Sequence, residues 1–115
     1  MPEKNLLGTA LEPCSLAPLT GFARDGYCRS HPADGAAHLV CATLTDTFLS
    51  FTRSRGNDLS GLRAGDRWCL CAGRWREALE GGAAPPVVPS ATAEQALQFV
   101  NVASSSASSH GRAVQ

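Results

Sequence analysis

Glycine and proline are concentrated in the first 37 residues, and this constrains the fold more than any other feature of the chain. Eight of the chain's 18 Gly and Pro residues (11 Gly and 7 Pro) lie in this third. Such a density favours turns and short extended pieces over long helices. Asp25 and Gly26 are predicted to form a tight hairpin turn. We therefore expect regular secondary structure only from His38 onward.

The first regular elements are predicted directly after this turn-rich third. Residues 38–45, HLVCATLT, are rich in β-branched and small apolar side chains, which predicts a strand. Asp46 is placed to cap a following helix over residues 47–55, which carries Phe48, Leu49 and Phe51 on one side. Gly56 follows as the expected left-handed residue at the end of that helix.

The second half of the chain predicts the same alternation of elements. A short strand over 67–72, a helix over 73–82, a proline-bound edge strand over 84–89 and a third helix over 93–100 follow in order. Thr92 and Gln95 have the spacing of a capping box ahead of this last helix. Alternating strands and helices imply right-handed crossovers between parallel strands. The expected fold class is therefore α/β (or α+β): a small mixed, partly parallel sheet with about three helices, preceded by a turn-rich N-terminal third.

Length and composition indicate one domain. The chain has 115 residues, and we expect residues 1–103 to form a single globular domain. Residues 104–115 are rich in serine and have little to bury, which predicts a disordered tail.

Charge and hydropathy bear on partners and location. Ten basic residues balance ten acidic ones, so no nucleic-acid partner is expected. No apolar run approaches the roughly 18 residues of a membrane span, and the N-terminus does not resemble a secretory signal. These features predict no membrane association and a cytoplasmic location. Because the cytoplasm keeps thiols reduced, all five cysteines are expected to be free.

The stretch RWCLCAGRW places two cysteines one residue apart. On a strand Cys69 and Cys71 share one face, with α-carbons about 6.6 Å apart, which disfavours a disulfide between them. They could pack in the core as small hydrophobes, act as reactive thiols, or bind a thiophilic metal. No C-x-x-C pair exists, so no metal is expected by default. The candidates for a metal site are Cys28, Cys41, Cys69 and Cys71, with His31 and His38 as further possible ligands.

The loops supply a second group of candidates. Arg24 and Cys28 flank the predicted hairpin turn, and a thiol near a guanidinium has a lowered pKa. Cys28, Cys69 and Cys71 are therefore the candidate catalytic nucleophiles. The side chains of Arg24, Asp25, Asn57 and Asp58 could instead hold a small polar ligand, or simply form turns and caps.

Catalytic motifs give little support to any one reaction. His38 could act as a general base, but no Ser or Cys lies at a motif spacing from it. Neither G-x-S-x-G, a phosphate-binding loop nor G-x-G-x-x-G occurs. Three hypotheses therefore stay open: a binding module for a small molecule or a protein, a cytosolic thiol-dependent enzyme or redox sensor, and a Cys-ligated metal-binding protein. The sequence identifies no cofactor.

Several segments together resemble one known family. RDG, RGNDL and GDRWCLCA occur in the order found in the small bacterial family called domain of unknown function 2237, from about Asn5 to Val100. The resemblance implies a bacterial, single-domain, soluble protein and no particular reaction, because the family has no assigned activity.

This sequence departs from the family pattern at two places. Family members commonly carry two cysteines after the DG pair, whereas here Tyr27 takes the first position and Cys28 the second. Ser60 joins Gly61 directly, where relatives tend to carry a longer loop. If that loop closes over a ligand in relatives, the corresponding site in this protein is more open or absent.

Overall fold

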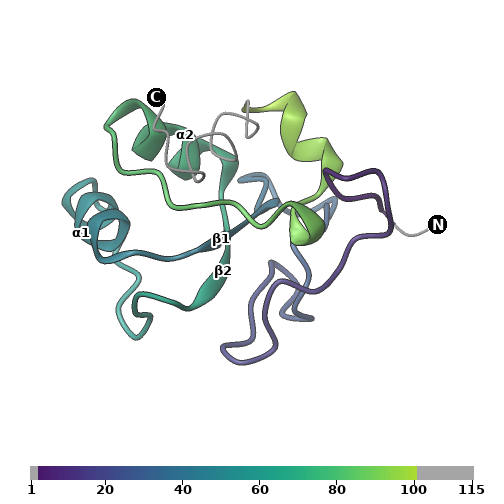
Figure 1. Cartoon of the computed structure of the whole chain (residues 1–115), viewed down its shortest axis with the longest axis horizontal. Helices are drawn as coiled ribbons and strands as arrows, with labels where there is room; N and C mark the ends of the chain where they lie inside the picture. The colour runs from purple at the N-terminus through teal and green to yellow at the C-terminus, as the bar shows by residue number, and fades with distance from the viewer. Residues whose placement is uncertain (1–2, 101–115) are drawn as a thin grey trace.

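A computed structural model describes residues 3–100 of the chain, which form a small mixed α+β fold (Figure 1). The predicted tail over 104–115 lies outside the described residues. Figure 1 shows α1 and α2 at one end of the molecule and the N-terminal loops at the other. The elements, in chain order, are strand β1 (Val40–Thr43), helix α1 (Asp46–Ser54), strand β2 (Arg67–Leu70), helix α2 (Ala72–Glu80) and two 3-10 segments, η1 (Pro89–Ala91) and η2 (Glu94–Gln98).

The sheet has two strands and is antiparallel, so the prediction of a partly parallel sheet is wrong. Cys41 of β1 lies opposite Cys69 of β2. The reason lies in the connection after α1, which returns to the end of β1 instead of crossing to its start. There Leu44 N donates to Asp66 O (2.8 Å) and Gly65 N donates to Leu44 O (2.9 Å). β2 therefore starts beside the end of β1 and must run in the opposite direction.

The two α-helices fall where the sequence predicted helices. Thr45, not Asp46, caps α1: its hydroxyl accepts a hydrogen bond from Phe48 N (3.0 Å). Asp46 instead occupies the first helical turn, where its charge complements the helix dipole. The second helix, α2, begins directly after β2, with Cys71 as its N-cap residue.

The predicted third helix is only a 3-10 segment, so about three helices is also wrong. Thr92 was expected to cap it, but the buried Thr92 hydroxyl accepts from Cys41 N (3.0 Å) and donates to Val88 O (2.9 Å). The hydroxyl is thus used between distant segments and no longer available as a cap. The predicted edge strand over 84–89 forms only an isolated antiparallel bridge between Val87 and Ala42. Its prolines have no N–H with which to extend the pairing.

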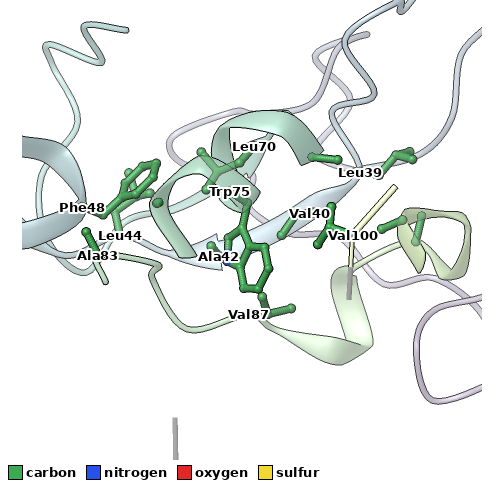
Figure 2. Close-up of a cluster of buried hydrophobic side chains, with 14 residues drawn as sticks. Leu39, Val40, Ala42, Leu44, Phe48, Leu70, Trp75, Ala83, Val87 and Val100 are labelled. Atoms are coloured by element: carbon green, nitrogen blue, oxygen red, sulfur yellow. The ribbon is translucent and has the colours of Figure 1, made fainter. Parts of the chain in front are cut away.

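The main core lies between the sheet and the two helices (Figure 2). Trp75 of α2 is fully buried, and its indole N–H donates to Pro85 O (3.1 Å). Phe48 of α1 packs in the same core, as do Val40 and Leu70 of the sheet. None of the helices in the described part of the chain is long and apolar enough to cross a membrane.

Asn5 fastens the N-terminal loops to the segment around η1. Its side chain is fully buried, and its amide nitrogen donates to Thr9 Oγ1 (2.9 Å), Ala10 O (3.1 Å) and Ser90 O (3.0 Å). Its oxygen accepts from the backbone N–H groups of Leu7 (2.9 Å) and Thr9 (3.0 Å).

Asn5→Ala should lower the free energy of unfolding by about 2–4 kcal/mol, because several polar groups lose their partner, at about 1–3 kcal/mol for each one left buried. Urea denaturation at equilibrium measures this change. Asn57→Ala is the matched control, because within residues 3–100 the Asn57 side-chain amide makes a single hydrogen bond, to Thr52 Oγ1 (3.1 Å). Equal losses in the two variants would contradict this role for Asn5.

Candidate functional site

Cys71 has no disulfide partner, unlike the other four cysteines of the described chain. It follows β2 and is the N-cap residue of α2, and it is partly exposed. The thiol makes a contact with His38, whose Nε2 lies 3.2 Å from Cys71 Sγ. A nucleophile and a base are therefore within hydrogen-bonding distance of each other.

The antiparallel pairing brings these two residues together. His38 lies just before β1 and Cys71 just after β2, and Val40 pairs with Leu70. The start of one antiparallel strand lies beside the end of its partner, so the two residues meet at one end of the sheet. The backbone closes this end with a hydrogen bond from Ala72 N to Ala37 O (3.0 Å). A parallel pairing would have placed His38 and Cys71 at opposite ends.

Asp34 completes a chain of three side chains, which we call the Cys71–His38–Asp34 triad. The Asp34 carboxylate oxygens lie 3.0 and 3.1 Å from His38 Nδ1, and one of them accepts from His38 N (2.8 Å). The other accepts from Ala36 N (3.0 Å). Only 2% of the Asp34 side chain is exposed, so the carboxylate depends on these partners.

The negative charge of Asp34 determines which ring nitrogen of His38 carries the proton. Burial by itself raises the pKa of Asp34, but the hydrogen bonds from the backbone and ring of His38 outweigh it and hold this pKa below its ordinary value. An ionised carboxylate only accepts hydrogen bonds, so His38 Nδ1 must carry the proton that it donates to Asp34. In the neutral ring, Nε2 is then left as an acceptor that faces the Cys71 thiol.

The thiol itself is held in its protonated form at rest. Burial raises the pKa of Cys71, and the negative charge of Asp34 raises it further. The backbone hydrogen bond of Cys71 and the positive charge of Arg74 act in the opposite direction without reversing the shift. A reaction at Cys71 near neutral pH therefore requires a base that removes the thiol proton, and His38 is in position to do so.

The beginning of α2 provides hydrogen-bond donors beside the thiol. Among the described residues, the N–H groups of Gly73 and Arg74 have no acceptor, as is usual for the first turn of a helix. Cys71 makes no side-chain capping bond to them. These N–H groups and the positive end of the helix dipole can stabilise negative charge that develops next to Cys71.

The immediate surroundings of His38 are aromatic. The Phe22 ring stacks on His38 with a centroid distance of 6.1 Å and contacts His31 at 5.1 Å. Phe22 is 39% exposed, so its ring forms an apolar surface that solvent and ligands can reach. Asp34 also borders a small cavity of about 80 Å³. The side chains of Leu39 and Phe99 form part of its apolar lining.

Ala37 has a left-handed backbone between Asp34 and His38. Its φ is +55°, which is unusual for a residue with a β-carbon. The conformation lets Ala37 O accept from both Leu39 N (2.8 Å) and Ala72 N (3.0 Å). Such backbone strain is concentrated at functional sites in proteins, which agrees with a site at this end of the sheet.

Asp34 was not predicted as a site residue from the sequence, and no partner was predicted for His38. The available signal was the spacing: Asp34 and His38 are four residues apart in a turn-rich segment. The contact between His38 and Cys71 spans 33 residues and depends on the direction of β2. No local motif encodes it.

The loop residues predicted to bind a ligand mainly serve local structure. Arg24 donates to Gly21 O and lies 5.2 Å from the centroid of the Trp68 ring. Asp25 accepts from Tyr27 N (3.1 Å) and from Arg29 Nε (2.7 Å). Burial alone raises the pKa of Asp25, but the bonds from Arg29 and Tyr27 lower it below its ordinary value.

The second predicted pair lies after α1. Asn57 is bonded to Thr52 at the end of this helix, and Asp58 borders a surface groove of about 410 Å³ together with Asp46, Arg53 and Arg63. In the described chain no hydrogen bond or ion pair links Arg24 or Asp25 to Asn57 or Asp58. A ligand shared by all four residues stays a prediction.

Two disulfides correct the expectation of five free thiols. Cys14 is bonded to Cys41, and Cys28 to Cys69. The turn-rich N-terminal third folds over the sheet face that carries Cys41 and Cys69, and so brings Cys14 and Cys28 against them. The four cysteines pack with Ala91 in a second core, which we call the buried cysteine cluster. Cys71 is not part of it.

The comparison with protein families agrees with the resemblance seen in the sequence. No curated protein matches the chain. The family model described as "Uncharacterized protein conserved in bacteria (DUF2237)" matches residues 4–108, which is most of the chain. The chain therefore belongs to this bacterial family of unknown function.

Proposed function

We propose that the protein is a thiol-dependent enzyme with Cys71 as nucleophile, His38 as general base and Asp34 as the residue that orients His38. The observation that supports this proposal is the continuous chain of contacts from Cys71 Sγ to His38 Nε2 (3.2 Å) and from His38 Nδ1 to Asp34 (3.0 Å). The same order of nucleophile, base and carboxylate serves acyl transfer on several unrelated folds.

The chemistry that suits this arrangement is attack on an electrophilic carbonyl carbon. The Cys71 thiol gives its proton to His38 Nε2 while its sulfur forms a bond to the carbonyl carbon. The Asp34 carboxylate, which accepts from Nδ1, stabilises the imidazolium that results. The carbonyl oxygen, now an oxyanion, is stabilised by the N–H groups of Gly73 and Arg74.

The second half of the reaction restores the enzyme. The bond between the carbonyl carbon and the leaving group breaks, and His38 Nε2 returns the proton to the leaving group. This leaves a thioester on Cys71. A water molecule, deprotonated by His38, then attacks the thioester and releases the carboxylic acid and the free thiol. Atoms and protons balance without a cofactor or an oxidant.

An activated ester tests the proposal directly. Incubation with p-nitrophenyl acetate should add one acetyl group to the wild-type chain, which intact-mass and peptide mass spectrometry should locate on Cys71. Cys71→Ala should remove both the adduct and the enzymatic release of p-nitrophenol. The sample is kept free of reductant so that the two disulfides leave Cys71 as the only thiol.

His31→Ala is the matched control for this experiment. His31 contacts the same Phe22 ring as His38 but has no contact with Cys71 in the described structure. Cys71 of the His31→Ala variant should be acetylated at the wild-type rate. An adduct that forms on another residue, or a Cys71→Ala variant that turns over the ester as fast as the wild type, contradicts the proposal.

The cytoplasmic location inferred from the sequence stays part of this proposal. It was based on the sequence features of the N-terminus and the absence of a long apolar run, and it implied free thiols, whereas disulfides persist mainly in oxidising compartments. Non-reducing mass spectrometry of alkylated protein taken from its own cells distinguishes free thiols from disulfides. Stable disulfides in that sample would contradict a cytoplasmic location.

A further inference from the structure

We propose that the buried cysteine cluster is a second functional site: when its two disulfides are reduced, Cys14, Cys28 and Cys41 bind one zinc ion. The Sγ atoms of these three residues all lie within 4.8 Å of one another, and all three residues are buried. With a Zn–S distance of about 2.3 Å, tetrahedral geometry requires sulfur atoms about 3.8 Å apart. The sulfurs of Cys14 and Cys41 are bonded to each other at 2.04 Å, so reduction must let them move apart to this spacing, whereas Cys28 Sγ already lies within 4.8 Å of both.

Backbone contacts that do not involve the disulfides also position these cysteines. Cys14 N donates to Gly26 O (2.7 Å), and Cys41 N donates to the hydroxyl of the fully buried Thr92 (3.0 Å). Cys28 forms an isolated parallel bridge with Thr92. These contacts do not involve the sulfur atoms, so they can keep the three thiols together after reduction.

The surroundings of the cluster select the kind of metal. Every member of this group in the described chain is a cysteine, and the apolar Val88 and Ala91 pack against it. Thiolates favour zinc and other thiophilic ions over magnesium and calcium, which require oxygen ligands. Zinc has no redox chemistry of its own, so it does not reoxidise the thiols.

The step that opens the site is a reduction. Each disulfide takes up two electrons and two protons, and in the experiment a trialkylphosphine supplies the electrons and becomes the phosphine oxide with an oxygen from water. Two disulfides therefore consume two phosphines and yield four thiols, including Cys69. Zinc then displaces the protons of the three coordinating thiols.

This site differs from the cysteine set expected from sequence in three residues. It includes Cys14, which no motif singled out, and it excludes Cys69 and Cys71, the second of which is in contact with His38 instead. The proposal is therefore independent of the triad, and either can fail without the other.

Native mass spectrometry with zinc tests the proposal. Wild-type protein reduced with a trialkylphosphine should bind one zinc ion per chain, and the oxidised protein should bind none. Cys14→Ser should weaken zinc binding by more than the 10- to 100-fold that the loss of an outer-shell partner costs. Cys71→Ser is the matched control and should bind zinc as the wild type does. Zinc that is kept by Cys14→Ser, or lost by Cys71→Ser, overturns the assignment.

Circular dichroism and the absorption spectrum with cobalt cover the case in which the reduced chain unfolds. If it does, zinc should restore the far-ultraviolet spectrum and raise the melting temperature with concentration, because it binds only the folded chain. Cobalt in place of zinc should give the near-ultraviolet charge-transfer band of thiolate ligands. Zinc binding by a chain that stays unfolded contradicts a site that belongs to this fold.

Discussion

His38→Ala should slow the acetylation of Cys71 by about 10²- to 10⁴-fold near neutral pH, which is the usual contribution of a general base. The reason is the state of the thiol: burial and the Asp34 charge raise the pKa of Cys71, so the sulfur keeps its proton unless His38 removes it. Stopped-flow release of p-nitrophenol measures the first acylation step, and His31→Ala serves as the control.

The pH dependence separates loss of the base from a general loss of structure. Because the folded-state pKa of Cys71 is raised, the thiolate forms only at alkaline pH, above the ordinary thiol value of about 8.5. In His38→Ala the rate should therefore keep rising as the pH passes this value, and it should approach the wild-type rate only above the raised pKa of Cys71. A variant that is equally slow at every pH would show that His38 supports the fold and does not act as the base.

Asp34→Asn extends the same test to the third residue. The carboxylate requires a proton on His38 Nδ1, whereas an amide can donate to Nδ1 and so move the proton to Nε2. With Nε2 protonated, His38 could no longer accept the thiol proton, and the rate should fall nearly as far as in His38→Ala. Wild-type rates in Asp34→Asn would remove Asp34 from the mechanism.

Removal of the disulfides should have the largest effect on stability. The Cys14–Cys41 bond closes a loop with a sequence separation of 27, and the Cys28–Cys69 bond one of 41. Loop-closure entropy gives about 3.5 and about 4 kcal/mol for loops of these lengths. Because small domains have a total stability of about 5–15 kcal/mol, loss of both bonds should unfold a large part of the population at elevated temperature.

Thermal melts of the double variants Cys14→Ser/Cys41→Ser and Cys28→Ser/Cys69→Ser measure the two contributions separately. Cys71→Ser, which breaks no disulfide, is the control and should melt close to the wild type. The N-terminal third has no helix or named strand within the described residues, so we expect it to lose its order first. Identical melting of the oxidised and the phosphine-reduced wild type, measured without metal, would contradict this role of the disulfides.

The sequence predicted individual elements well where local chemistry decides them. Asp46 and Gly56 correctly indicated where one helix lies, although Thr45 and not Asp46 caps it, and the i, i+3, i+4 spacing of Trp75, Ala78 and Leu79 predicts the other. The periodicity of side chains and the capping residues act within a few positions, so they can be read without the rest of the chain.

The direction of the second strand was not encoded in this way. The alternation of strands and helices indicated parallel strands, but the hydrogen bonds of Leu44 with Gly65 and Asp66 bring the chain back antiparallel. The predicted third helix failed for a similar reason, because the Thr92 hydroxyl bonds to Cys41 and Val88 and not to its own helix. In both cases contacts between distant segments outweighed the local preference.

The candidate site shows the same division. Cys71 was among the thiols that the sequence singled out, but it was expected on a strand, whereas the structure places it at the start of helix α2. Which cysteines pair, and which one stays free beside His38 and Asp34, was decided only by the tertiary structure. The physical reason is that a disulfide or a triad depends on distances of a few ångströms between residues tens of positions apart, and these distances are fixed by strand direction and by the packing of the N-terminal loops.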